Sequence, residues 1–114
     1  MNHEELKAVR SFLNLDVEAS AKLLAVDEDH PDGVTRRSWQ RWEHGEFNIP
    51  EGIKSKVKEV LDRRSKLLNY HLDRGTAEMT IPYELAEVNP LEFKIQLSVI
   101  YELYAKGRIK ILIA

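Results

Sequence analysis

The stretch that decides the fold is Thr35-Arg36-Arg37-Ser38-Trp39-Gln40-Arg41-Trp42-Glu43-His44-Gly45. It opens with a good N-cap and closes on a glycine, which predicts one short helix over residues 35–44. Trp39 and Trp42 are three residues apart, so they share a face and should anchor the helix in the core. The residues that fall away from that face are Arg36, Arg37, Gln40 and Arg41. Such a helix suits the DNA major groove, where arginine pairs with guanine edges.

The segments on either side of this stretch predict further helices. We expect helices over residues 3–13, over residues 17–25, and from Pro50 to Arg74. Asn2 with Glu5, and Asn48 with Glu51, have the spacing of capping boxes, and Asp16 is a good N-cap for the second helix. The N-terminal half of the chain therefore reads as a series of short helices.

The C-terminal part predicts one long helix and a small β element. Asn89, Pro90 and Glu92 form a strong helix start, and Gly107 should end that helix. Its apolar residues are too many for one narrow stripe, so it should be buried on most sides. The segments expected to form strands are Met79–Tyr83 and Ile109–Ile113. A strand at a chain end needs a partner, which is either the Met79–Tyr83 segment or a second subunit.

Two short helices, a turn and a third helix with arginines make a helix-turn-helix. The residues that match this pattern include Leu6, Val9, Arg10, Leu15, Asp16, Ala21, Trp39, Trp42, Glu43, Gly45, Ile49 and Pro50. This string resembles repressors of the phage Cro and cI type. In that family an arginine of the first helix pairs with a glutamate after the recognition helix aromatics, which implies a structural ion pair between Arg10 and Glu43. A mostly buried guanidinium needs a carboxylate, so the implied pair is physically reasonable.

The opening Glu5–Arg10, the step Leu15–Ala19 and the core Arg37–Glu43 narrow the resemblance. They are similar to the YdiL-like and anti-CRISPR-associated regulators. That resemblance implies a homodimeric repressor, often of its own operon, that binds double-stranded DNA at an inverted repeat. It also implies a helix-turn-helix domain over 1–74 and a dimerisation segment over 75–114. The Val26–Gly33 turn is several residues longer than usual for the family.

The resemblance assigns a role to each side of the expected recognition helix. Thr35 would cap it and touch a phosphate, and Gln40 would contact a base or the backbone. The residues expected to reach base edges are Arg36, Arg37 and Arg41. The residues expected in the core are Trp39 and Trp42.

Composition limits the classes of protein and the compartment to which the chain can belong. The chain has 114 residues, 43% of them apolar and none of them cysteine, which fits a reducing compartment and leaves no thiol nucleophile. No apolar run approaches the length of a membrane span, and the first residues lack a signal-peptide pattern, so we expect a cytoplasmic protein. The net charge is −2, yet binding depends on the local field, and Thr35–Arg41 holds three arginines and no acid.

We expect no enzyme, no cofactor and no metal. The chain lacks a glycine-rich phosphate loop, a zinc-ligand spacing and a nucleophile elbow. The acidic loop Asp27–Gly33 fails the calcium-loop spacing, because Pro31 and Ser38 stand at ligand positions. A second basic group is more typical of a solvated face than of a phosphate-binding track; it comprises Lys54, Lys56, Lys58, Arg63, Arg64 and Lys66.

The sequence thus predicts a mainly α protein with an N-terminal helix-turn-helix domain of the five-helix type. A C-terminal helical dimerisation segment and a small β element complete this fold class. The predicted function is sequence-specific DNA binding in transcriptional repression. Two alternatives stay open: an antitoxin-like adaptor that binds a protein, and a regulator that also binds RNA.

Overall fold

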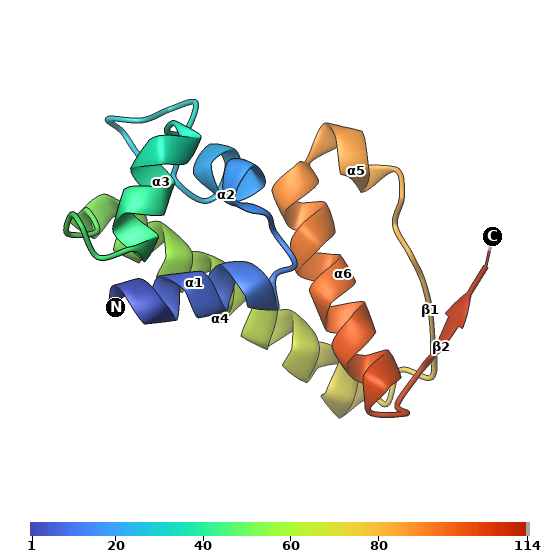
Figure 1. Ribbon diagram of the computed structural model, residues 1–114. Coiled ribbons are helices and arrows are strands. Elements are labelled where there is room, and N and C mark those ends of the chain that lie inside the picture. Colours follow the sequence, from blue (N-terminus) through green and yellow to red (C-terminus); the bar gives the residue numbers. More distant parts are fainter. Residues whose placement is uncertain (114) are drawn as a thin grey trace. The chain divides into compact units, whose positions relative to one another are not determined.

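The computed structural model describes residues 1–113, and the fold is mainly helical with one small sheet (Figure 1). The elements in chain order are α1 (His3–Phe12), α2 (Val17–Leu23), α3 (Arg36–Glu43), α4 (Glu51–Arg74), β1 (Glu78–Thr80), α5 (Leu85–Val88), α6 (Pro90–Ala105) and β2 (Lys110–Leu112). The expected fold class, mainly α with a small β element, is confirmed. No helix among residues 1–113 is long and apolar enough to cross a membrane.

The chain forms two compact units, and the division between them falls inside α4. Unit 1 comprises Met1–Glu59, and unit 2 begins at Val60. This structural boundary does not test the expected functional one, with a helix-turn-helix domain over 1–74 and a dimerisation segment over 75–114. The functional boundary stays a prediction. Each unit is described by itself below.

Unit 1 is a cluster of helices in which α3 packs against both α1 and α2. The helices begin where their capping residues predict. The Asn2 side chain accepts a hydrogen bond from the Glu5 amide at 2.8 Å, and the Asp16 side chain accepts one from the Ala19 amide at 2.7 Å. The fully buried apolar side chains include Leu6, Leu13, Leu24, Trp39, Ile53 and Val57. Local capping and a shared apolar core together fix the position of α3.

Unit 2 is built around α6 and a two-stranded parallel sheet. β1 pairs with β2 in a register that places Met79 beside Ile111, so the partner of the terminal strand is the earlier segment of the same chain. The core of this unit is Val99, Ile100, Leu103 and Ile109, with Leu67, Leu68, Met79 and Ile111 packed against it. The sequence analysis did not predict the four-residue helix α5. Its N-cap residue makes no side-chain capping bond, so it lacks the capping signal that marks the other short helices.

A buried polar network joins α4 to α6 within unit 2. Arg64 is only 5% exposed. It donates to Ser98 Oγ at 2.9 Å and to Glu102 Oε1 at 2.9 Å. A hydrogen bond from Lys106, followed by one from Arg64, holds the pKa of the Glu102 carboxyl below its usual range, although burial raises it. The interpretation of the α4 basic residues as one solvated face is therefore wrong for Arg64.

Candidate nucleic-acid interface

Helix α3 has one face held in the core of unit 1. The Thr35 hydroxyl accepts a hydrogen bond from the Ser38 amide at 3.2 Å and so caps the first turn. Trp39 is fully buried, and Trp42 is 7% exposed. Their rings meet edge to face, with centroids 5.9 Å apart and planes at 61°. The two indoles therefore fix the rotation of α3 about its own axis.

The opposite face of α3 carries the arginines. Arg36 and Arg37 are exposed, whereas Gln40 and Arg41 are half-buried. Within residues 1–113, neither the Arg36 nor the Arg37 side chain takes part in an ion pair or hydrogen bond. Their guanidinium groups are consequently available to a partner outside the chain.

Arg41 differs from the other two arginines because it already has neighbours. Its Nε lies 3.9 Å from Glu46 Oε2, and its guanidinium carbon lies 5.3 Å from the centre of the Phe47 ring. Phe47 was not among the residues expected at this surface. The sequence signal for it is an aromatic residue just after the glycine that ends the expected recognition helix.

The Arg10 and Glu43 side chains form a two-pronged ion pair. Arg10 Nε lies 2.6 Å from Glu43 Oε2, and Arg10 Nη2 lies 3.1 Å from Oε1. The indole N–H of Trp39 donates to the same carboxylate, a bond that the sequence analysis missed although the two residues are four apart on one helix. Arg10 also donates to the Leu15 carbonyl at 3.2 Å. Glu43 thus links Trp39 on the buried side of α3 to Arg10 of α1, and Arg10 in turn holds the turn after α1.

The long turn between α2 and α3 has internal order. The Asp27 carboxylate accepts a hydrogen bond from the His30 amide at 2.7 Å, and it lies 2.8 Å from His30 Nδ1. Burial alone raises the pKa of the Asp27 carboxyl, but the bonds to His30 outweigh it and leave the pKa lowered. At the end of the turn Gly33 has φ of +86°, and a Cβ there would lie 2.4 Å from the Ala21 carbonyl oxygen. This geometry fixes how the chain enters α3 (Figure 1).

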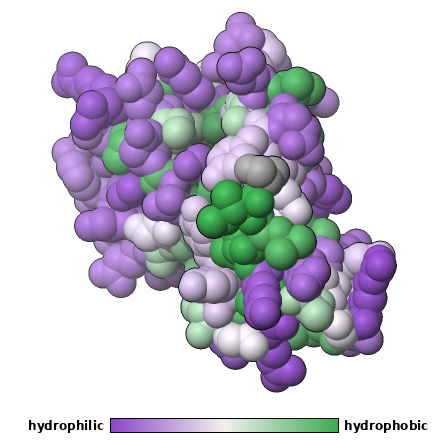
Figure 2. Space-filling model, turned by 90° about the vertical axis from the view of Figure 1, so that its right-hand side faces the viewer, coloured by the Kyte–Doolittle hydropathy of each residue, from purple (hydrophilic) through white to green (hydrophobic). Residues whose placement is uncertain are grey.

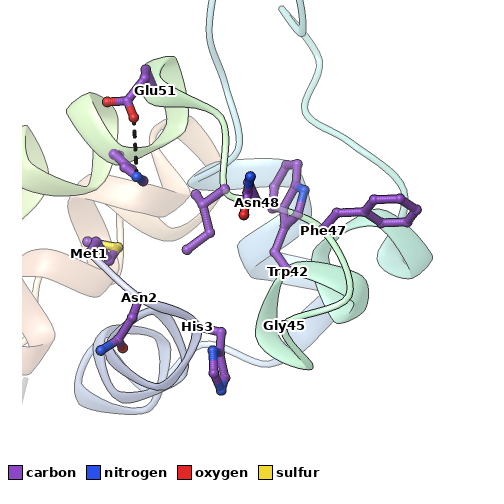
Figure 3. Close-up of a pocket in the computed structure, with 10 residues that line it drawn as sticks. Met1, Asn2, His3, Trp42, Gly45, Phe47, Asn48 and Glu51 are labelled. Carbon is purple, nitrogen blue, oxygen red and sulfur yellow. Dashed lines mark hydrogen bonds and ion pairs between the residues drawn. The ribbon is translucent and has the colours of Figure 1, made fainter.

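A shallow hollow of about 490 Å³ lies in unit 1 beside the C-terminal end of α3. Its lining combines apolar and polar groups from the start of α1, the turn after α3 and the start of α4 (Figure 3). Lys54 and Glu51 pair at 3.2 Å along one side. Phe47 belongs to the rim, and Figure 3 shows its ring pointing away from Trp42. Of the residues expected at the site, the lining includes Trp42.

The structure thus places the expected site residues on two sides of one short helix. Trp39, Trp42 and Glu43 lie inward with Arg10, and the remaining expected residues lie outward. Among residues 1–113, no group of three or more histidine or acidic side chains could hold a metal ion. The outward face offers cationic hydrogen-bond donors, which is the chemistry that recognises phosphates and guanine edges.

Comparison with known proteins identifies the family of this chain. The curated Aca2 repressor of Pectobacterium phage ZF40 is 30% identical over 69 residues, which is 60% of this chain and 53% of that relative. The matched segment therefore spans about half the length of the relative. The profile of the Aca2/YdiL-like family matches residues 1–112, which confirms the resemblance inferred from the sequence. The chain belongs to the Aca2/YdiL-like family.

Proposed function

We propose that this protein is a sequence-specific DNA-binding repressor of transcription, with α3 as its recognition helix. The main support is the pair Arg36 and Arg37, whose exposed side chains have no hydrogen-bonding or ionic partner in the part of the chain described. They lie opposite the two buried tryptophans, so the helix can present them to a groove without losing its core. The name of the curated relative, Aca2 repressor, supports the regulatory role.

Each outward residue of α3 is assigned a different part of the DNA according to its position on the helix. Thr35 stands at the N-terminal end, where helix amides and a hydroxyl suit a backbone phosphate. Arg37 and Arg41 are four residues apart, so they lie on one ridge, roughly 6 Å apart along the helix axis. That rise corresponds to about two base-pair steps. Arg36 and Gln40 form the neighbouring ridge. Bidentate pairing of each arginine with a guanine gives the sequence preference.

The repressor acts as a homodimer, with the contact in the C-terminal segment, residues 75–114. In the described part of that segment the sheet has two strands, so β1 and β2 each leave one edge unpaired. Parallel sheets are normally covered on both faces, whereas Tyr83, Leu112 and Ile113 are exposed beside these strands. Figure 2 shows hydrophobic side chains gathered on the side of the structure that carries the strands. A second copy would cover them and pair the open edges.

A two-fold dimer of this kind reads an inverted repeat. Its recognition helices should lie about 34 Å apart, or a multiple of that distance, to enter successive major grooves on one side of the duplex. The promoter of the protein's own operon is the proposed operator. The site of action is the cytoplasm.

The test of base reading is selection of bound duplexes from a random DNA pool. We expect a palindromic consensus. The Arg36→Ala and Arg37→Ala variants should each lose roughly 1–3 kcal/mol of discrimination, at one base pair per half-site. Arg74→Ala, which removes an exposed arginine from unit 2 outside the proposed dimer segment, is the matched control and should bind like the wild type. Equal weakening on every DNA sequence, or stronger competition by hairpin RNA than by the selected duplex at fixed salt, would contradict the proposal.

The test of the dimer is the molar mass in solution, measured by light scattering after size exclusion. We expect Leu112→Asp to shift the protein from dimer to monomer, because it places a charge on the exposed apolar surface that the second copy would cover. Val88→Asp is the control, since Val88 is 83% exposed on α5 and should leave the dimer intact. A dimer that resists the first change, or dissociates only with the second, would locate the contact elsewhere.

A further inference from the structure

We propose that Arg41 and Phe47 act together as one reader, in which the guanidinium pairs with a guanine and the phenyl ring contacts the methyl group of a neighbouring thymine. This inference rests on the proposed function, because it assumes that α3 enters the major groove. It adds a specificity-determining residue that lies outside the recognition helix. It also names the chemical group that this residue detects.

The position of Phe47 is fixed relative to Arg41 by the turn that ends α3. Gly45, with φ of +75°, has the left-handed backbone that such a turn requires. Its amide donates to the Trp42 carbonyl at 3.2 Å, and the Glu46 amide donates to the Arg41 carbonyl at 2.9 Å. These two bonds are the pair that defines a Schellman motif. The chain therefore leaves α3 in a set direction and brings Phe47 back beside Arg41.

The Phe47 side chain does not serve the core. It is 55% exposed and lies at the rim of the hollow, where Figure 3 shows its ring pointing away from Trp42. Its recorded ring contact is with Arg41, whose guanidinium carbon is 5.3 Å from the ring centre. An exposed phenyl ring touching a DNA-facing arginine offers an apolar surface beside a hydrogen-bond donor.

The chemistry of the two groups matches adjacent bases. A guanidinium packed on an aromatic ring keeps its in-plane N–H groups free for bidentate hydrogen bonds. Guanine presents O6 and N7 to such a fork, and thymine presents its methyl group to apolar side chains such as phenylalanine. The weak pairing with Glu46, at 3.9 Å, can be exchanged for the guanine edge without leaving a buried charge.

Helix α4 of unit 2 supplies a matched pair of the same kind. Arg74 lies with its guanidinium carbon 5.7 Å from the Tyr70 ring centre and also donates to the Tyr70 hydroxyl at 2.6 Å. The Arg74 and Tyr70 pair is not on the recognition helix. A Tyr70→Ala variant therefore controls for the loss of an exposed ring stacked with an arginine.

The experiment uses the selected duplex, with each thymine replaced in turn by deoxyuridine, which lacks only the methyl group. For the wild-type protein we expect one sensitive thymine in each half-site. It should lie next to the guanine that Arg41 reads, which is about two base-pair steps from the base that Arg37 reads. Its replacement should weaken binding roughly fourfold, the effect of one apolar carbon left in water. Phe47→Ala should bind the thymine and deoxyuridine duplexes equally, whereas Phe47→Tyr and Tyr70→Ala should keep the difference.

The outcomes separate this inference from the function on which it rests. If the wild-type protein selects a consensus but no thymine is sensitive, the reader is refuted and the repressor proposal stands. The same holds if Phe47→Ala keeps the sensitivity, or if it weakens binding to all sequences equally. If selection yields no consensus, both proposals fail. Circular dichroism of each variant verifies that the helices are retained.

Discussion

Glu43 should be among the most costly side chains to remove from unit 1. The change is Glu43→Ala, which deletes the acceptor shared by the Arg10 guanidinium and the Trp39 indole. After it, Arg10 retains the Leu15 carbonyl as a partner, and the indole N–H of a fully buried residue has none. We expect α3 to lose its attachment to α1 before any other contact in the unit fails.

The magnitude follows from the burial of the two partners. The Glu43 side chain is 6% exposed and that of Arg10 is 17% exposed, so water can replace only part of what is lost. Removing one partner of a buried pair costs roughly 3–5 kcal/mol. A buried N–H left without an acceptor costs roughly 1–3 kcal/mol. This cost is not simply added to the first, because both partners bind the same carboxylate. We expect a total near 4 kcal/mol, a large share of the roughly 5–15 kcal/mol that holds a typical domain together.

The assay is urea unfolding combined with hydrogen–deuterium exchange of peptides from α1 and α3. Glu46→Ala is the control, since that carboxylate is 58% exposed and lies 3.9 Å from its partner Arg41. Its loss should cost less than about 1 kcal/mol. Arg10→Met combined with Glu43→Ala should recover part of the stability, because no charge is then left unpaired. Equal costs for Glu43→Ala and Glu46→Ala would refute the reasoning.

Three further changes test other parts of the structure. Gly33→Ala should lower stability by roughly 2–3 kcal/mol, because its φ is positive and the new Cβ would meet the Ala21 carbonyl oxygen at 2.4 Å; an unchanged melting temperature would show that the turn can relax. Arg64→Ala should cost unit 2 roughly 3 kcal/mol in urea unfolding, since it leaves polar groups of α6 buried without their donor; a loss no larger than that of an exposed arginine would contradict its role. The pKa of Glu102 is lowered in the folded state, so its contribution is complete above the usual value near 4.5 and is lost as the pH falls through the folded value. Unfolding experiments from pH 6 to pH 3 should therefore show a decline that Glu102→Gln makes shallower, and equal slopes for the two proteins would argue against the carboxylate.

The features of unit 1 that depend on neighbouring residues could be read from the sequence. The N-caps at Asn2, Asp16 and Thr35 lie within three residues of the amides they bind. The tryptophans of α3 reveal its buried side by their spacing alone. The start of α6 at Asn89 followed from the same local rules, and its side chain accepts from the Glu92 amide at 3.2 Å.

Features that depend on distant partners could not be read in this way. The burial of Arg64 requires Ser98 and Glu102, which are 34 and 38 residues further along the chain. Its spacing from Val60 and Leu67 places Arg64 on the apolar stripe of α4, but the α4 sequence does not show which groups of α6 pair with its guanidinium. The bond from Trp39 to Glu43 is a different case, because the spacing of four was visible but the family resemblance had already assigned the carboxylate to Arg10. At the candidate site, Phe47 was missed because exposure of one aromatic residue in a turn depends on how the turn is closed.

The distribution of aromatic residues between the two units gives each its own chromophore. Both tryptophans of the chain lie on α3 in unit 1, whereas all four tyrosines, Tyr70, Tyr83, Tyr101 and Tyr104, lie in unit 2. Fluorescence excited at the red edge of indole absorption therefore reports on the first unit alone, and ultraviolet difference spectra of the phenols report on the second. The native protein, without any attached dye, can thus reveal whether its two halves melt as one cooperative body or in separate steps.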